Sequence, residues 1–251
     1  MSDKNNTIDI LGVNINKTDM TQAVKTAEEY METDGFHYIF TPNSEIVMSA
    51  YKDGNFKEII NGADMLTPDG IGLVYAAKIL GNPLKERVAG FDLVMKLLEG
   101  LPKSGKTAYL FGSAPGVAIE AKNKLEEKFP GINICGTANG FFDEKREREI
   151  IDEINALKPD LLLVCLGSPK QEKWISEHKD ELACRLAMGV GGTLDVISGK
   201  AKRAPDIFIK LGLEWFYRLI KQPTRIVRMM ALPKFLFTVI GKKIKGENKN
   251  A

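Results

Sequence analysis

The chain has 251 residues, of which 44% are hydrophobic and 27% charged, and its formal net charge is +2. This is the composition of a soluble globular protein, with enough length for one large domain or a domain and an appendage. The N-terminus lacks a basic stretch followed by an apolar one, and no apolar run approaches the roughly 18 residues that a membrane span needs. We therefore expect no secretory signal, no transmembrane helix and a cytoplasmic location.

The charge is unevenly distributed along the chain. Residues 200–251 contain 13 Lys and Arg against 3 Asp and Glu, which leaves 22 against 30 for residues 1–199. The last fifth of the chain is thus a basic module. Such a module requires an anionic partner or surface.

The predicted elements alternate along most of the chain. Strands are predicted at residues 8–14, 37–40, 65–67, 107–111, 132–135, 160–166 and 185–190. Helices are predicted at residues 18–32, with Thr18 as N-cap, and at 44–51, 56–61, 70–80, 90–99, 115–129, 143–157 and 169–178. This alternation predicts an α/β fold, a Rossmann-like and mainly parallel sheet flanked by helices.

A basic helical appendage is expected to follow this body. The predicted division is a Rossmann-like α/β domain over residues 1–199 and an appendage over residues 200–251. Its helices are predicted at residues 206–221, 224–232 and 234–245, the first with Ile207, Leu211, Trp215 and Leu219 on one stripe. Apolar faces rimmed by Lys and Arg suit an anionic membrane surface, and a packed helix pair with a solvated basic face is the alternative.

Residues 100–107, Gly-Leu-Pro-Lys-Ser-Gly-Lys-Thr, match the phosphate-loop pattern letter for letter. That loop needs a strand before it and a helix after it, so that backbone N–H groups face the phosphates. Here a predicted helix precedes and a predicted strand follows. We interpret the segment as a helix-to-strand turn, with a nucleotide hydrolase as the alternative.

The three cysteines, Cys135, Cys165 and Cys184, lie in apolar stretches without C-x-x-C spacing. We interpret them as small buried residues in a reducing compartment, in preference to a metal or redox role. The two histidines, His37 and His178, do not complete a ligand set. No Asp-x-Asp pair is present either, so the sequence predicts no metal site.

Asp69 follows a short predicted strand, in the turn Pro68-Asp69-Gly70. Ligands of open α/β sheets bind outside the carboxyl ends of the strands, so a carboxylate there is a candidate general base. Thr41 and Asn43 follow the preceding strand and are expected at the same edge.

Glycines and polar side chains also follow three later strands. These candidate ligand-binding residues are Gly112, Ser113, Gly167, Lys170, Gln171, Gly191, Gly192 and Asp195. Taken together they predict a lined cleft. For the glycines, close packing of helix on strand is an equal alternative, and for Lys170 and Gln171 it is a solvated helix turn.

Four arginines are candidates for contact with a phosphate group. Arg87 lies on a loop, and its planar fork suits phosphate better than any other side chain. Arg218, Arg225 and Arg228 have spacings of seven and three that recur on one helical face. Pro223 lies between them and makes a shared face less certain.

Read together, these motifs resemble the TagA/TarA/WecG glycosyltransferases, glycosyltransferase family 26, over about residues 8–240. The matching segments are residues 41–47, 67–72, 86–92, 167–174, 188–192, 202–205, 214–215 and 217–218. The resemblance implies inverting transfer of a sugar from a UDP-sugar to undecaprenyl-diphosphate-linked N-acetylglucosamine at the inner face of the cell membrane. Its best-matching branch uses UDP-N-acetylmannosamine and starts the linkage unit of wall teichoic acid.

The resemblance also assigns roles to residues. By this resemblance, Asp69 corresponds to the general base of the family, and Thr41, Asn43, Arg87 and Gln171 surround it. Residues 200–251 resemble a membrane-associating appendage. Because the chain has no Asp-x-Asp pair to hold a metal ion, arginines and helix N-termini are expected to stabilise the negative charge of the departing UDP. No metal or other cofactor is therefore expected.

The sequence leaves open the donor sugar, the oligomeric state and a non-catalytic alternative. The donor is UDP-N-acetylmannosamine or, as the alternative, the UDP-sugar of mannosaminuronate or glucose. Either of these alternative donors would serve the synthesis of a different surface polysaccharide. A homo-oligomer is neither required nor excluded. A non-catalytic nucleotide-binding module is a more distant alternative, and the aromatic residues of the tail favour lipid over nucleic acid as its partner.

Overall fold

The computed structural model describes residues 6–210, 213–214, 216–217 and 231–246. It begins with an antiparallel hairpin of β1 (Thr7–Ile10) and β2 (Val13–Asn16). The single strand predicted for residues 8–14 is therefore wrong. Leu11 and Gly12 have φ of 57° and 89°, and two successive residues in this left-handed region reverse the chain within a two-residue loop.

Six parallel strands form the main sheet, in the order β4-β3-β8-β7-β5-β6. They are β3 (His37–Phe40), β4 (Met65–Leu66), β5 (Thr107–Gly112), β6 (Asn133–Ala138), β7 (Leu161–Cys165) and β8 (Leu186–Gly189). This confirms the predicted α/β fold. Because all six strands run the same way, their carboxyl ends meet at one edge of the sheet.

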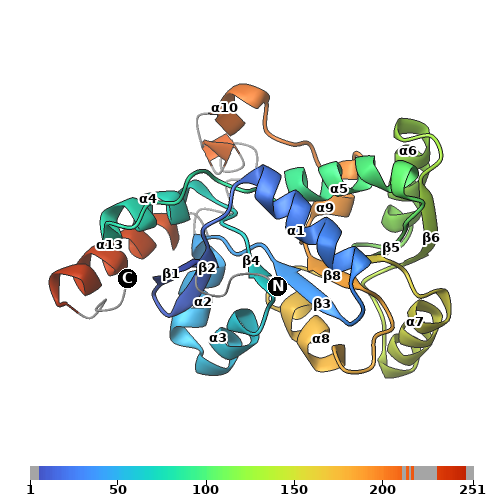
Figure 1. Ribbon diagram of the computed structural model, residues 1–251, viewed down its shortest axis with the longest axis horizontal. Helices are drawn as coiled ribbons and strands as arrows, with labels where there is room; N and C mark the ends of the chain where they lie inside the picture. Colours follow the sequence, from blue (N-terminus) through green and yellow to red (C-terminus); the bar gives the residue numbers. More distant parts are fainter. Residues whose placement is uncertain (1–5, 211–212, 215, 218–230, 247–251) are drawn as a thin grey trace.

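Helices cover both faces of the sheet (Figure 1). They are α1 (Met20–Glu32), α2 (Ser44–Lys52), α3 (Gly54–Asn61), α4 (Ile71–Leu80), α5 (Gly90–Ser104), α6 (Val117–Lys128), α7 (Glu144–Leu157), α8 (Lys170–His178) and α9 (Thr193–Ile197). The predicted N-cap Thr18 is wrong by one residue: Asp19 caps α1, and its carboxylate accepts from the Gln22 N–H at 2.9 Å. The short helix α9 was not predicted.

The segment that matches a phosphate loop is mostly helical. Helix α5 runs past the predicted end at residue 99 to Ser104, with Pro102 inside it, and Gly105 ends it at φ 68°. Strand β5 then begins at Thr107, which confirms a helix-to-strand turn. Lys106 Nζ donates to the Met31 carbonyl oxygen at 3.0 Å, so this lysine is engaged by the end of α1.

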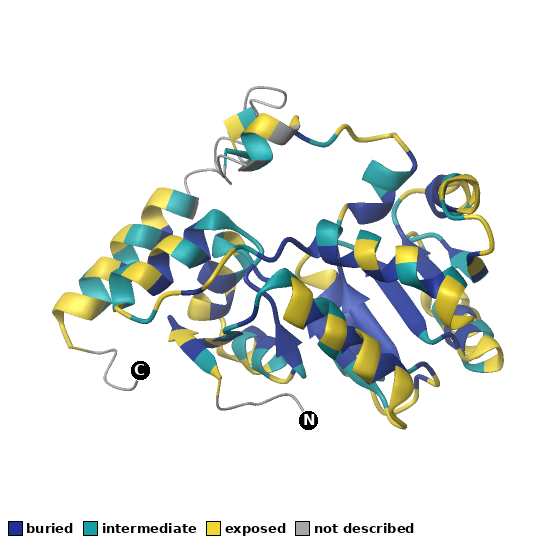
Figure 2. Ribbon diagram, turned by 45° about the horizontal axis from the view of Figure 1, so that its top comes forward, coloured by how far each residue is buried: buried dark blue, intermediate teal, exposed yellow. Residues whose placement is uncertain are grey.

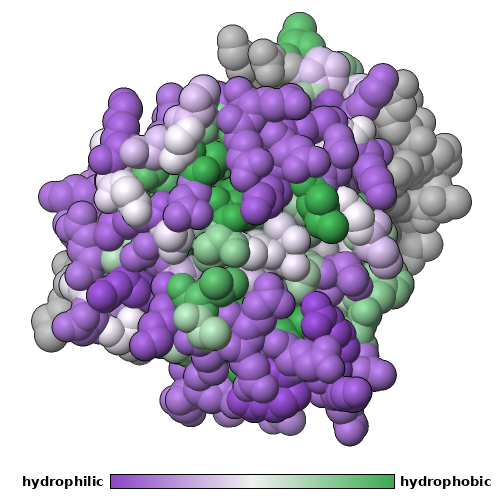
Figure 3. All heavy atoms as spheres, turned by 90° about the vertical axis from the view of Figure 1, so that its right-hand side faces the viewer, coloured by the Kyte–Doolittle hydropathy of each residue, from purple (hydrophilic) through white to green (hydrophobic). Residues whose placement is uncertain are grey.

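Two apolar layers hold the helices on the sheet. Leu162 and Val164 face one layer, with Phe111 and Trp174, while their strand neighbour Leu163 faces the other. Strands buried on both faces explain why the sequence shows continuous apolar runs there. Figure 2 shows the buried strands between helices whose outer sides are exposed. On the face at the β6 side of the molecule, hydrophilic side chains surround a smaller apolar group (Figure 3).

The described C-terminal elements are α10 (Asp206–Lys210) and α13 (Ala231–Ile244). Helix α13 packs against α4 and α2 (Figure 1), where Phe235 and Val239 are fully buried. A Cβ on Gly72 would lie 2.6 Å from Leu232 Cδ1, so glycine lets the two helices approach. None of the helices in the described part of the chain is both long and apolar enough to cross a bilayer.

Much of the predicted 206–221 and 224–232 helices lies outside the described residues. The division at residue 199 stays a prediction.

Candidate active site

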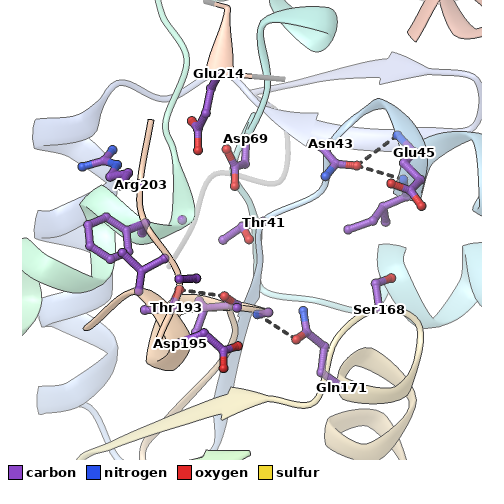
Figure 4. Close-up of a pocket in the computed structure, with 18 of the residues that line it drawn as sticks. Thr41, Asn43, Glu45, Asp69, Ser168, Gln171, Thr193, Asp195, Arg203 and Glu214 are labelled. Carbon is purple, nitrogen blue, oxygen red and sulfur yellow. Dashed lines mark hydrogen bonds between the residues drawn. The ribbon is translucent and has the colours of Figure 1, made fainter. Parts of the chain in front are cut away.

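A cleft of about 770 Å³ lies over the carboxyl ends of β4, β3, β8 and β7 (Figure 4). Its polar lining residues include Thr41, Asn43, Glu45, Asp69, Ser168, Gln171, Thr193, Asp195, Lys200, Lys202, Arg203, Glu214 and Tyr217. The described residues thus line the cleft both from the sheet edge and from the segment after α9, at positions 200–203, 214 and 217.

Backbone hydrogen bonds fix the turn that carries Asp69. The Asp69 N–H donates to the carbonyl oxygens of Thr67 and Pro42, at 2.9 and 3.1 Å, and the Val88 N–H donates to Pro68 at 3.0 Å. The turn is therefore tied to the two loops beside it. Gly70 follows with φ 147°, a conformation that favours glycine.

Thr41 and Asn43 line the same cleft and also hold the local structure. Asn43 Oδ1 caps α2 by accepting from the Glu45 and Ile46 N–H groups at 2.9 and 3.1 Å. Thr41 Oγ1 donates to the Gly189 carbonyl oxygen at 3.3 Å, which joins the ends of β3 and β8. With its oxygen engaged in the cap, Asn43 has its amide N–H groups to offer a ligand.

Arg87 stands behind the cleft wall, between two carboxylates. Its Nη2 donates to Glu214 Oε2 at 2.8 Å, and its Nε lies 3.6 Å from Asp69 Oδ1. Burial by itself lowers the pKa of Arg87, but the charges of Asp69 and Glu214 outweigh it and the pKa is raised. The guanidinium is therefore permanently charged beside Asp69.

Gln171 braces the glycine loop that follows β8. It is 3% exposed; its Oε1 accepts from the Gly191 N–H at 2.8 Å, and its Nε2 donates to Glu172 Oε1 at 2.9 Å. Burial raises the pKa of Glu172. The Gln171 amide is thus held at both ends (Figure 4), and the Gly191 and Gly192 that it braces line the cleft.

Asp195 and Ser113 meet at the base of the cleft. Ser113 Oγ donates to Asp195 Oδ2 at 3.3 Å, and Asp195 lines the cleft whereas Ser113 supports it from the end of β5. Asp195 belongs to α9, which the sequence did not indicate as a helix.

The structure places three other predicted residues away from the cleft. A Cβ on Gly112 would lie 2.3 Å from the Cys165 carbonyl oxygen, so glycine is needed there for close packing. Lys170 Nζ donates to the Gly140 carbonyl oxygen at 3.2 Å and lies 4.0 Å from the Phe142 ring centroid. Gly167 does not line the cleft but accepts, through its carbonyl oxygen, the first hydrogen bond of α8.

Arg218, Arg225 and Arg228 lie outside the described residues. Their predicted contact with a diphosphate stays a prediction.

The described residues after α9 add cleft residues that were not assigned to the site from sequence. Lys200, Lys202, Arg203 and Glu214 line it, and Arg203 Nη2 donates to Asp92 Oδ2 at 2.6 Å. The matching segments at 202–205 and 214–215 were the available signal. The sequence does not show which end of a basic segment turns toward the sheet, so no role followed from it.

The three cysteines are not candidates for the chemistry of the cleft. Burial raises the pKa of Cys165 and of Cys184 to about 12 and raises that of Cys135, so the thiols stay protonated and unreactive at neutral pH. Within the described part of the chain, no three His, Cys, Asp or Glu side chains form a group that could hold a metal ion.

Comparison with known proteins agrees with this architecture. The model of the Glycosyl transferase WecG/TagA/CpsF family matches residues 8–249. Three similar proteins are each named N-acetylglucosaminyldiphosphoundecaprenol N-acetyl-beta-D-mannosaminyltransferase.

The Bacillus spizizenii protein is 38% identical over 211 residues, which is 84% of this chain and 81% of its own length. The Bacillus subtilis protein is 36% identical over 80% of this chain and 78% of its own length. The Staphylococcus aureus (strain MRSA252) protein is 34% identical over 95% of this chain and 94% of its own length. With its sheet, its cleft and this match along nearly the whole sequence, the chain belongs to the glycosyl transferase WecG/TagA/CpsF family.

Proposed function

We propose that this chain transfers N-acetylmannosamine from UDP-N-acetylmannosamine to undecaprenyl-diphosphate-linked N-acetylglucosamine, with inversion, and so forms the β-1,4 linkage of the wall teichoic acid linkage unit. The observation that carries the proposal is Asp69, fixed in the cleft beside the charged Arg87, in a chain of this family. The names of its relatives specify this acceptor and a β-D-mannosaminyl product. A mannosaminuronate or glucose donor, for a different surface polysaccharide, is the alternative.

Asp69 acts as the general base in this proposal. Its carboxylate takes the proton of the acceptor hydroxyl, the hydroxyl oxygen attacks the anomeric carbon of the donor, and the bond from that carbon to UDP breaks. One base suffices for this single displacement, whereas glycoside hydrolysis uses two carboxylates. Arg87 keeps Asp69 ionised, because a cation beside a carboxylate favours its charged form.

The departing UDP needs positive charge and hydrogen-bond donors. Lys200 and Lys202 line the cleft, and Gln171 holds the backbone of the Gly191–Gly192 loop, which lines it too. These groups stabilise a diphosphate leaving group in the way that phosphate clamps do. Metal independence is part of the proposal and is tested by chelation.

We place the enzyme on an anionic membrane surface through residues 200–251. Helix α13 exposes Phe237 at 73% and Ile244 at 79%, close in sequence to the exposed Lys243 and Lys245. Apolar side chains among lysines are typical of helices that lie in the interface of anionic membranes. Binding to vesicles that contain phosphatidylglycerol, but not to phosphatidylcholine vesicles, is the expected result.

The decisive experiment measures UDP release by the purified chain. It uses a lipid-diphosphate-N-acetylglucosamine acceptor and, in turn, UDP-N-acetylmannosamine, UDP-N-acetylmannosaminuronate, UDP-glucose and UDP-N-acetylglucosamine. We expect turnover with the first donor only, unchanged by EDTA. Preference for another donor would move the chain to the alternative, UDP binding without release would indicate a non-catalytic module, and loss of activity in EDTA restored by Mg²⁺ or Mn²⁺ would refute metal independence.

A further inference from the structure

One ion pair joins the C-terminal segment to the proposed base. Glu214 Oε2 lies 2.8 Å from Arg87 Nη2, and the two side chains are only 14% and 16% exposed. A charge withdrawn from water to this extent is stable only with a partner. The pair therefore connects positions 127 residues apart in the sequence by a contact that neither side chain can give up at low cost.

The same guanidinium also faces Asp69. Arg87 Nε lies 3.6 Å from Asp69 Oδ1, while its Nη2 is engaged by Glu214. A planar guanidinium presents donors in fixed directions, so the contact with Glu214 determines how the remaining edge meets Asp69. Figure 4 shows Glu214 and Asp69 directed into the same part of the cleft.

A second contact attaches the same segment about ten residues earlier. Arg203 Nη2 donates to Asp92 Oδ2 at 2.6 Å, and the Arg203 guanidinium lies 4.5 Å from the centroid of the Phe91 ring. Asp92 is in the first turn of α5, and Arg87 precedes that helix. Two ion pairs of opposite polarity thus attach the segment, one to the first turn of α5 and the other to the loop before that helix.

We propose that Glu214 is a positioning residue for the transfer reaction, which holds Arg87 beside Asp69 and, together with Arg203, attaches the segment that follows α9 to the cleft wall. The kinetic part of this inference rests on the proposed function. The attachment rests on the contacts alone. Glu214 touches neither substrate nor reacting atoms in this role and acts through Arg87.

The proposal fixes the direction of a pH effect. Besides Asp69, the charged side chains that line the cleft in the described part of the chain are Glu45, Asp195, Lys200, Lys202, Arg203 and Glu214, and Arg87 and Asp92 are paired with Glu214 and Arg203 behind them. In Glu214→Gln the amide oxygen still accepts from Arg87 Nη2, so the guanidinium stays beside Asp69 while one negative charge is lost, which lowers the pKa of Asp69. Activity requires ionised Asp69 and is lost as pH falls through that pKa, so the acid limb moves to lower pH.

The first test compares Glu214→Gln with the wild type and with Glu181→Gln. Glu181 pairs with Arg148 at 2.6 Å on the exposed surface at α7, so it is a matched carboxylate away from the cleft. We expect Glu214→Gln to lower kcat about tenfold, because a weaker base removes less of the acceptor proton. We also expect it to move the acid limb of kcat/KM down by about one to two pH units, the effect of a charge roughly 6 to 12 Å away at an effective dielectric of about 20.

The second test measures attachment without any turnover. Hydrogen exchange in peptides covering residues 203–210 is expected to quicken several-fold in Glu214→Ala and in Asp92→Asn, and not in Glu181→Gln. If the wild type releases UDP from no donor while Glu214→Ala quickens exchange, the proposed function fails and the attachment stands.

An unmoved acid limb in Glu214→Gln, or unchanged exchange in Glu214→Ala, would overturn the positioning role. Glu214→Gln is nearly isosteric with the native side chain, so its pH profile remains measurable if the alanine variant fails to fold.

Discussion

The turns after β4 and β5 follow buried strands at the same sheet edge, and each holds a glycine in the positive-φ region, Gly70 at 147° and Gly112 at 129°. Yet the first turn presents Asp69 to the cleft, while the second packs against a neighbouring strand. A Cβ on Gly70 would lie 3.4 Å from Asn43 Cβ, whereas on Gly112 it would lie 2.3 Å from a carbonyl oxygen.

A glycine at the end of a strand therefore does not by itself indicate a ligand site. The position of the strand in the sheet decides its use. The cleft lies over β4, β3, β8 and β7, and the turns of β5 and β6 fall beyond it. Four substitutions test this contrast, in order of falling effect.

Asp69→Asn removes the base and is expected to have the largest effect. We expect kcat to fall by about 10²- to 10⁴-fold, with UDP affinity in calorimetry within a few-fold of the wild type. Asp53→Asn is the matched control, because asparagine also caps the helix that Asp53 begins. Retained turnover in Asp69→Asn would remove Asp69 from the mechanism.

Gln171→Ala releases the Gly191 loop and should have the next largest effect. We expect kcat/KM to fall about 10- to 100-fold, because a loop displaced by about 1 Å can cost 10²-fold. Asn155→Ala is the control: its amide likewise accepts from a backbone N–H, that of Ala183 at 2.7 Å, away from the cleft. Equal activity losses in the two variants would mean that Gln171 contributes only to stability.

Gly112→Ala tests the turn that lies outside the cleft. The added Cβ meets the Cys165 carbonyl oxygen, and such overpacking destabilises a protein by about 1–3 kcal/mol. We expect a lower midpoint in urea and, at low temperature, a KM for the donor equal to that of the wild type. Gly54→Ala, where a Cβ meets nothing within 4 Å, is the control. A raised KM in Gly112→Ala would return this turn to the binding site.

Lys170→Ala should have the smallest effect. The lysine contacts Phe142 and the Gly140 carbonyl oxygen, and an exposed cation–π contact contributes about 0.5–1 kcal/mol. We expect a slightly lower urea midpoint with unchanged kcat and KM. A several-fold rise in KM, beside unchanged values for Lys173→Ala on the same helix, would place Lys170 at the substrate.

Local sequence patterns predicted the α/β alternation, the strand ends and several of the residues that line the cleft, because apolar runs and turn residues are local signals. Asp69, Thr41, Asn43, Gln171 and the Gly191 loop all lie where strand ends meet. The β1–β2 hairpin and the extended α5 were mispredicted, since element boundaries depend on packing that no local pattern encodes.

Which of these strand ends share a cleft is evident only from the tertiary structure, because the order of strands in the sheet depends on pairing between distant segments. The tertiary structure also shows that Gly112 lies against the Cys165 backbone and Lys170 against the Phe142 ring, and that Glu214 reaches Arg87 across 127 positions of sequence. An ion pair between distant segments leaves no periodicity in the sequence. Its partners become evident only when the folded chain withdraws both charges from water.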